Sequence, residues 1–339
     1  MKNKKQIILY LLVLIVIVSA CRKKEGPFYE VPRIEYDVFI NNYNGHYYWF
    51  DNIDGYSRTN FVSIIFDAAN SSNFVITDAD GNVIKEFDEQ EALKIFPYIE
   101  FPDSFVVLKR EDINALRFKE KWTFNYGKAK IKKEVVAFAP VFIDRENFLT
   151  TEQMTVYNLF WIYPEPGITK GGEIVITEKI AYDVHIDNSG AFINTKYGKS
   201  PYYFSNIETS VRKEIIDGIV NAGLKRNYHV CDYFFDEMTD YSLKRVEHKV
   251  DTLLVPISDE PGDVEEVIVE GTLNRSLVNK LKFIEKWKLN VKNLMFVKEI
   301  YAINPSLEVL GDDGSFRGHS PLFWIVYDEK DVEKFDLQY

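Results

Sequence analysis

The sequence predicts an α+β protein made of two tandem homologous domains, each a mainly antiparallel sheet with one or two helices. The first observation is an internal repeat: residues 116–140 and 281–305 align without a gap and are identical at 10 of 25 positions. The second is that matched segments flank both copies in the same order. The third is alternation of apolar and polar residues, typical of a sheet with one solvated face. A repeat of this length indicates a duplicated domain rather than a solenoid.

The repeated segment is predicted to be a β-hairpin at the centre of each sheet, built around the sequence Glu-Lys-Trp. In the first copy the turn is predicted at residues 125–128, where Gly127 can take positive φ. The identical positions are Leu116/Leu281, Phe118/Phe283, Glu120/Glu285, Lys121/Lys286, Trp122/Trp287, Asn125/Asn290, Lys133/Lys298, Glu134/Glu299, Ala137/Ala302 and Pro140/Pro305.

Two further runs accompany each hairpin. Ile34–Asn42 and Ile180–Asn188 share a Tyr-Asp-Val core, and the apolar runs Leu159–Tyr163 and Leu322–Tyr327 follow the hairpins. The copies are 146 residues apart at the first run (180 − 34), 165 at the hairpin (281 − 116) and 163 at the last run (322 − 159). The sequence therefore predicts a common core, with a net insertion in the middle of the second copy, between Asn188 and Leu281.

Two helices are predicted from apolar residues that recur three and four positions apart. Thr59–Asn70 is expected to be capped by Ser57 or by its own first residue. Ser205–Asn221 is expected to be capped by its first residue or by Asn206, and to end at Gly223. We expect Trp122 and Trp287 to lie at equivalent buried positions, each covering the helix of its own copy.

Residues 1–20 are predicted to be a lipoprotein signal peptide. Three lysines precede the apolar run Ile7–Val18, and small residues lead to Cys21. The run is too short for a membrane span. Cleavage before Cys21 and its acylation would attach the chain to a membrane through several acyl chains. The alternative is an ordinary secretory signal followed by a free cysteine.

Composition indicates an exported globular protein. The formal charge is −11, and removing three signal-peptide lysines makes it −14 (−11 − 3). Such an acidic chain is a poor candidate for binding nucleic acid. Cys21 and Cys231 are the two cysteines, so a disulfide framework is not predicted.

Candidate chemistry is sparse, and the sequence predicts no enzyme, cofactor or metal centre. His229 and Cys231 would share one side of a strand, but two more ligands for a zinc-like site are missing. Asp312 and Asp313 lie in a glycine-flanked loop that is better explained as a solvated turn than as a calcium site.

The two glutamates of the Glu-Lys-Trp sequences are predicted to stay apart, because they belong to separate domains. Glu285 is expected to pair with a basic neighbour such as Arg317. Arg317 is also a candidate for binding a partner. The other candidate partner-binding residues are Trp122, Trp287 and Trp324.

The second copy resembles the GldN/PorN family of gliding-motility and type IX secretion proteins. The resemblance is carried, in order, by the sequences at Ile215–Ile219, Tyr233–Thr239, Asp251-Thr252, Glu285–Trp287 and Gly314–Ile325. It extends to the first copy through the repeat. The first copy lacks the Gly-x-x-Arg-Gly approach to its last strand, and the family usually has one such domain without a lipid anchor.

The resemblance implies a non-enzymatic component that docks to envelope partners. We expect a signal peptide over 1–20, a tether over 21–27, and GldN-like domains over 28–168 and 169–339. The predicted function is an outer-membrane lipoprotein, facing the periplasm, in a gliding-motility or type IX secretion related complex. The alternative is a lipoprotein that binds a soluble glycan or peptide. Oligomerisation and the partners' identity stay open.

Overall fold

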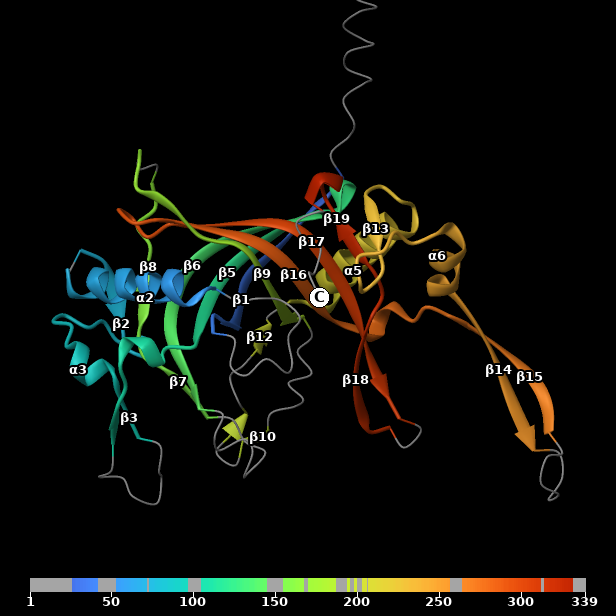
Figure 1. Ribbon diagram of the computed structural model, residues 1–339, viewed down its shortest axis with the longest axis horizontal. Coiled ribbons are helices and arrows are strands. Elements are labelled where there is room, and N and C mark those ends of the chain that lie inside the picture. Colours follow the sequence, from blue (N-terminus) through green and yellow to red (C-terminus); the bar gives the residue numbers. More distant parts are fainter. Residues whose placement is uncertain are drawn as a thin grey trace, which may run out of the picture.

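The computed structural model describes two large sheets, three two-stranded ones and several helices; one of the two-stranded sheets is a projecting hairpin (Figure 1). Within the described part of the chain, no helix has the length and apolar character that crossing a membrane requires. The described residues are 26–41, 53–71, 73–96, 105–144, 155–167, 170–186, 194–195, 198–199, 203–205, 207–256, 264–311 and 314–331.

The first sheet has the strand order β12-β1-β5-β6-β8-β2, and β7 also pairs with β6. Every pairing in it is antiparallel, and the repeated hairpin β5–β6 is central. Its strands are β1 (Phe28–Phe39), β2 (Val75–Thr77), β5 (Ala115–Asn125), β6 (Lys130–Asp144), β7 (Thr155–Asn158), β8 (Trp161–Tyr163) and β12 (Tyr203–Ser205).

The second sheet has the order β13-β19-β17-β16-β9, and β18 also pairs with β17. Apart from β12 this is the order of the first sheet, so the predicted duplication and fold class are confirmed. Its strands are β9 (Glu173–His185), β13 (His229–Cys231), β16 (Val278–Asn290), β17 (Phe296–Leu310), β18 (Phe316–Pro321) and β19 (Trp324–Val326).

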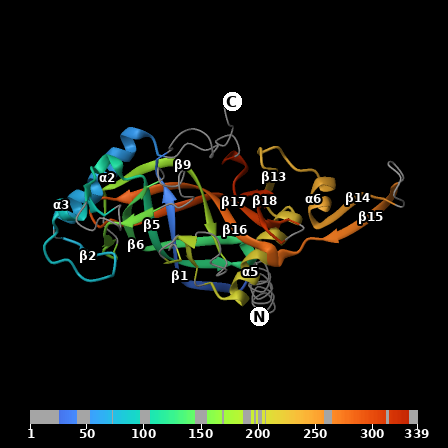
Figure 2. The ribbon, with the colours of Figure 1, turned by 90° about the horizontal axis from the view of Figure 1, so that it is seen from below.

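The two sheets lie face to face (Figure 2). Aromatic side chains pack between them. Phe118 of β5 makes edge contacts with Trp287 and Phe296 of the second copy, at centroid distances of 5.2 and 5.4 Å. The equivalent contact with the copies exchanged joins Trp122 of the first copy to Phe283 of the second, at a centroid distance of 5.5 Å. These five side chains are almost completely buried. The core of the molecule therefore lies between the copies, where edge-to-face ring pairs are favourable.

Both long helices form where the 3.6-residue periodicity predicts them, but their ends differ from the prediction. Helix α2 (Gly55–Asn70) begins earlier, because the side chain of Asp54 accepts hydrogen bonds from the first-turn backbone. Helix α5 (Thr209–Leu224) begins after Glu208, which makes no side-chain capping bond, and continues through Gly223. Gly223 lies inside the helix, and its lack of a Cβ makes room for the ring of Phe323.

The helices and strands of the two copies are intertwined. Phe61 of α2 makes an edge contact with Phe296 of the second copy at 5.7 Å. Gly218 of α5 lies against the ring of Phe124 in the first copy, where any Cβ would come within 2.6 Å of a ring carbon. Strand β12 of the second copy pairs with β1. The domain boundary predicted at residues 168–169 stays a prediction for the sequence units, because in space the copies exchange elements.

The predicted insertion in the second copy corresponds to a longer helix and hairpin after β13, called the arm here. After β2 the first copy continues into α3 (Glu89–Ala92) and the short pair β3 (Lys94–Ile95) and β4 (Val106–Val107). After β13 the second copy has α6 (Asp240–Glu247) and the long hairpin β14 (His248–Pro256) and β15 (Val264–Thr272). Figure 1 shows this hairpin projecting from the body. The remaining elements are β10 (Asn194–Thr195), β11 (Gly198–Lys199) and the 3-10 turns η1 (Arg110–Asp112), η2 (Tyr126–Lys128) and η3 (Arg275–Leu277).

The turn of the first hairpin uses Ala129, rather than Gly127, in the left-handed region. Ala129 has φ 45°. Gly127 instead permits a close backbone approach, because a Cβ on it would lie 2.8 Å from the backbone nitrogen of Gly26. The prediction of positive φ at Gly127 was therefore wrong: the glycine is needed for space.

Candidate functional site

A buried polar unit lies on the inner face of the first sheet. The alternation of β5 points Glu120 and Trp122 into the core, and Ile34 of the neighbouring β1 is in register with Glu120. Glu120 Oε2 accepts hydrogen bonds from the Tyr36 hydroxyl and from Trp122 Nε1, both at 2.7 Å. Glu120 is buried, so these donors replace the water around its carboxylate.

The second copy repeats this unit. Glu285 Oε2 accepts hydrogen bonds from the Tyr182 hydroxyl at 2.6 Å and from Trp287 Nε1 at 2.9 Å. The repetition follows from sequence, because each carboxylate is two residues before its tryptophan on the same strand face. Each unit leaves the second carboxylate oxygen for another partner.

That partner is a lysine of the opposite copy. Lys133 of β6 forms an ion pair with Glu285 Oε1, and Lys298 of β17 forms one with Glu120 Oε1, both at 2.7 Å. All four side chains are 0% exposed. The prediction that the two glutamates stay apart was therefore wrong, because the sheets pack face to face and bring them into one cluster. Glu285 also pairs with Lys133, and not with Arg317 as predicted.

Aromatic rings enclose the two ammonium groups. Lys133 Nζ lies 3.2 Å from the ring centroid of Phe283, and Lys298 Nζ lies 3.2 Å from that of Phe118. Tyr36 stacks on Tyr182 with centroids 5.7 Å apart and planes at 18°. Distances that repeat in both copies define an approximate two-fold axis through the tyrosine pair.

Burial and mutual attraction set the protonation of this charge cluster, which comprises Glu120, Glu285, Lys133, Lys298, Tyr36 and Tyr182. Burial lowers the pKa of Lys133 to about 8 against the opposing effect of both glutamates. Burial would raise the pKa of Glu120, but Lys298 and Lys133 outweigh it and hold that pKa below its usual value. Burial and the nearby carboxylates raise the pKa of Tyr36 well above its usual value. The two crossed ion pairs bring two glutamates and two lysines together in this cluster.

The charge cluster can fix how the copies join. A buried charge without its partner is very costly, so a packing of the sheets that separated the lysines from the glutamates would be disfavoured. Hydrophobic packing alone is less selective between alternative arrangements. The described side chains seal the cluster from solvent.

The tryptophans predicted as partner-binding residues lie inside the structure. Trp122 and Trp287 are 0% exposed, and their rings contact aromatic rings of the facing sheet. Trp324 is also 0% exposed and stacks on Phe235. As the chain is folded here, a partner would reach none of these three rings. Their assignment to partner binding stays a proposal that would need local rearrangement.

The other predicted site residues are scattered. Arg317 is exposed on β18, which leaves it accessible to a partner. Cys231 is buried in an apolar cluster, and burial raises the pKa of its thiol to about 12. Among the described residues, no three His, Cys, Asp or Glu side chains lie together as metal ligands. Cys21, Asp312 and Asp313 fall outside the described residues.

Sequence reasoning missed the roles of the two lysines and the two tyrosines. Lys133 and Lys298 were identical in the aligned copies, and each is opposite the tryptophan of its own hairpin. A lysine on the apolar face in both copies was the available signal. Which acid it would meet depends on the packing of the sheets, which no local pattern contains.

The edge strand β9 of the second sheet is a further surface. Strand β9 is 13 residues long and, among the described residues, pairs only with β16. Its Ile174 and Val175 are 36% and 47% exposed. A long unpaired edge can accept a strand from another protein.

The fold and the charge cluster define a class of protein: a duplicated antiparallel domain whose two copies interlock as one unit. The family model described as "Gliding motility associated protein GldN" matches residues 39–165 and again residues 193–335. These segments cover most of the chain, so the chain belongs to the GldN family, as a tandem duplication. A search of curated proteins finds no match.

Proposed function

We propose that this chain is a non-enzymatic structural component of a gliding-motility or type IX secretion related complex, anchored by a lipid and facing the periplasm. The observation that carries the proposal is the match of the gliding-motility family to both halves of the chain. The lipoprotein-like leader ending at Cys21 supports attachment to the outer membrane.

The charge cluster supports a structural role. Its acids and bases are used to join the two copies and are closed to a substrate, whereas acid–base catalysis requires contact with the reacting group. Two joined copies present related surfaces on one rigid unit, which raises the effective concentration for a repeated partner. The edge strand β9, which pairs with β16 alone in the described part of the chain, and the exposed Arg317 are surfaces on which such partners would dock.

The function is tested in cells. A strain lacking the chain should lose surface gliding or secretion across the outer membrane, and the wild-type chain should restore it. A chain with Lys133→Met, which breaks one of the crossed ion pairs, should restore less activity than one with Lys132→Met, an exposed neighbour. Normal gliding and normal secretion in the deletion strain would overturn the proposal.

A further inference from the structure

The outer face of each sheet carries a tryptophan at an equivalent position. Trp161 of β8 is in register with Thr77 of β2, and Trp324 of β19 is in register with Cys231 of β13. The two surroundings can therefore be compared residue by residue within one molecule.

The chain makes the same turn beside each tryptophan. The backbone nitrogen of Asp78 donates to the carbonyl of Asn82 at 2.9 Å, and that of Asp232 donates to the carbonyl of Asp236 at 2.8 Å. In each turn Oδ1 of the first aspartate accepts two further backbone hydrogen bonds. The turns are equivalent, so the fourth residue of one, Gly81, corresponds to the fourth residue of the other, Phe235.

The two copies differ at this fourth residue. Phe235 has φ 70°, a left-handed conformation that disfavours a phenylalanine, and it stacks on Trp324 at 5.2 Å and 21°. Gly81 has φ 94°, and a Cβ built on it would meet nothing within 4 Å. The second copy keeps a strained residue whose ring covers the tryptophan. In the first copy Gly81 has no side chain, and Lys119 lies on the Trp161 ring instead.

Two positions near this residue are apolar in the second copy and charged in the first. In the second copy Ile284 and Ala181 belong to the apolar cluster around Phe235. At the equivalent positions the first copy has Lys119 and Glu35. Lys119 Nζ lies 3.5 Å from the ring centroid of Trp161. A sealed apolar cluster in one copy is therefore a charged pocket in the other.

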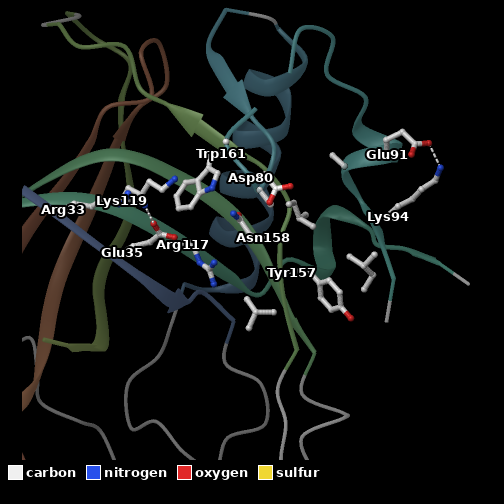
Figure 3. Close-up of a pocket in the computed structure, with 16 residues that line it drawn as sticks. Arg33, Glu35, Asp80, Glu91, Lys94, Arg117, Lys119, Tyr157, Asn158 and Trp161 are labelled. Carbon is white, nitrogen blue, oxygen red and sulfur yellow. Dashed lines mark hydrogen bonds and ion pairs between the residues drawn. The ribbon is translucent and has the colours of Figure 1, made fainter. Parts of the chain in front are cut away.

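The pocket has a volume of about 650 Å³, and Trp161 and Lys119 both line it (Figure 3). Trp161 is only 1% exposed, because the Lys119 ammonium lies on its ring. Arg33 pairs with Glu35 at 3.2 Å on one side, and Lys94 pairs with Glu91 on the other. Lys119 has no carboxylate partner within ion-pair distance among the described residues, and its ammonium is held by the ring face. The pocket therefore offers one cation that an incoming carboxylate could pair with.

The side chain of Asn158, which also lines the pocket, has a polar atom without a hydrogen-bond partner among the described residues. Asn158 Oδ1 is buried and accepts no hydrogen bond from the described residues. Asn158 ends strand β7, which pairs with β6 alone in the described part of the chain. A buried acceptor without a donor is unfavourable, so an N–H from an occupant would be favoured there.

We propose that this pocket binds an extended segment of a partner protein in which an aromatic residue is flanked by acidic residues. The ring takes the place that Phe235 fills in the second copy and moves the Lys119 ammonium off Trp161. A flanking carboxylate pairs with that ammonium, and a backbone N–H of the segment donates to Asn158. The proposal rests on the proposed function only for the source of the segment, an assembly partner.

The chemistry of the occupant follows from the second copy. There the covering ring comes from the sequence Asp-Tyr-Phe-Phe-Asp-Glu at residues 232–237, which contains three acids. The first copy has Gly81 in place of the phenylalanine and Lys119 in place of Ile284. Its pocket therefore has space for an aromatic ring and a cation for an acidic residue beside that ring. A synthetic peptide with the sequence of residues 232–239, DYFFDEMT, is therefore the probe.

The experiment measures binding of the labelled peptide to the purified chain from residue 22 onward, by fluorescence anisotropy. We expect one site per chain. Gly81→Phe should abolish binding by filling the pocket as Phe235 does, and Lys119→Glu should weaken it at least tenfold. Lys132→Glu, on an exposed position of β6 outside the pocket, should leave affinity within twofold. The peptide with both phenylalanines replaced by alanine should not bind.

Several results would overturn the inference: absence of saturable peptide binding, equal affinity of wild type and Lys119→Glu, or equal affinity of the alanine peptide. Thermal melting shows whether the Gly81→Phe variant folds. If this variant does not fold, the affinity of Lys119→Glu for the peptide decides whether the pocket is the binding site. Self-association of the wild type that both variants abolish would assign the pocket to a second copy and overturn the assignment to a different protein. Gliding and secretion do not enter this measurement, so its failure is separate from that of the proposed function.

Discussion

Tyr36 stacks on Tyr182, its counterpart 146 residues later, with ring centroids 5.7 Å apart and hydroxyl oxygens 3.3 Å apart. Each hydroxyl donates to the carboxylate of its own copy. Each carboxylate is also paired with a lysine of the other copy. The tyrosine pair thus lies at the centre of the contact that makes one unit from two copies.

Replacing Lys133 by methionine should destabilise the chain by about 3–5 kcal/mol, because it leaves Glu285 buried without its cation. Replacing both Lys133 and Glu285, by Met and Gln, should cost less than the sum of the two single changes. Urea unfolding measures the three free energies. Lys132→Met is the matched control, because Lys132 is exposed on the same strand. Additive effects would show that the ion pair does not couple the copies.

Acid should destabilise the protein through Glu120. The neighbouring lysines hold its pKa below the usual 4.5 in the folded chain, so the unfolded state binds a proton more readily. The stabilisation is complete above pH 4.5 and is lost as the pH falls through the lowered folded value. Urea unfolding between pH 3 and 6 measures this slope. The Glu120→Gln/Lys298→Met chain should show a smaller slope, and an unchanged slope would contradict the assignment.

Replacing Trp287 by alanine should cost about 3–5 kcal/mol, because a fully buried ring leaves a cavity between the sheets. The change also removes the donor from Trp287 Nε1 to Glu285. Chemical denaturation gives the free energy, with Lys286→Ala at the adjacent, outward-facing position as control. A loss below about 1 kcal/mol would mean that the ring is not part of a packed core.

Replacing Cys21 by alanine should release the chain from the membrane fraction, because the predicted acylation site is lost. Fractionation of cells that express the wild type or the variant measures this, and labelling with a fatty acid probe reports acylation directly. Ser19→Ala, which leaves Cys21 in place, serves as the control. A Cys21→Ala chain that stays in the membrane pellet would refute the lipoprotein prediction.

Cys231 should react slowly with thiol reagents in the folded chain. Burial raises the pKa of its thiol to about 12, so little thiolate is present at pH 8. The chain from residue 22 onward contains this cysteine alone, which makes labelling with an Ellman-type reagent specific. The thiol should react rapidly only after denaturant is added. Fast labelling of the native chain, or stoichiometric bound zinc that is lost with Cys231→Ser, would contradict a packing role.

The local sequence determined which residues of each copy's central strands face the core and which face solvent. The alternation along residues 116–124 separates an inward from an outward face, and the repeat transfers that assignment to the second copy. The offsets between the copies also indicated an insertion in the second copy's middle, where the arm β14–β15 lies. These features depend on residues close to each other in the chain, so periodicity and alignment reveal them.

Only the tertiary structure decided how the copies meet. Lys133 and Glu285 are 152 residues apart in sequence (285 − 133), and nothing local to either residue specifies the other. The same holds for the space beside Gly81, which is a pocket only because the tryptophan of another strand lies next to it. Strand faces follow from a period of two residues, whereas contacts between faces follow from the packing of whole sheets, in which burial, shape and charge act together.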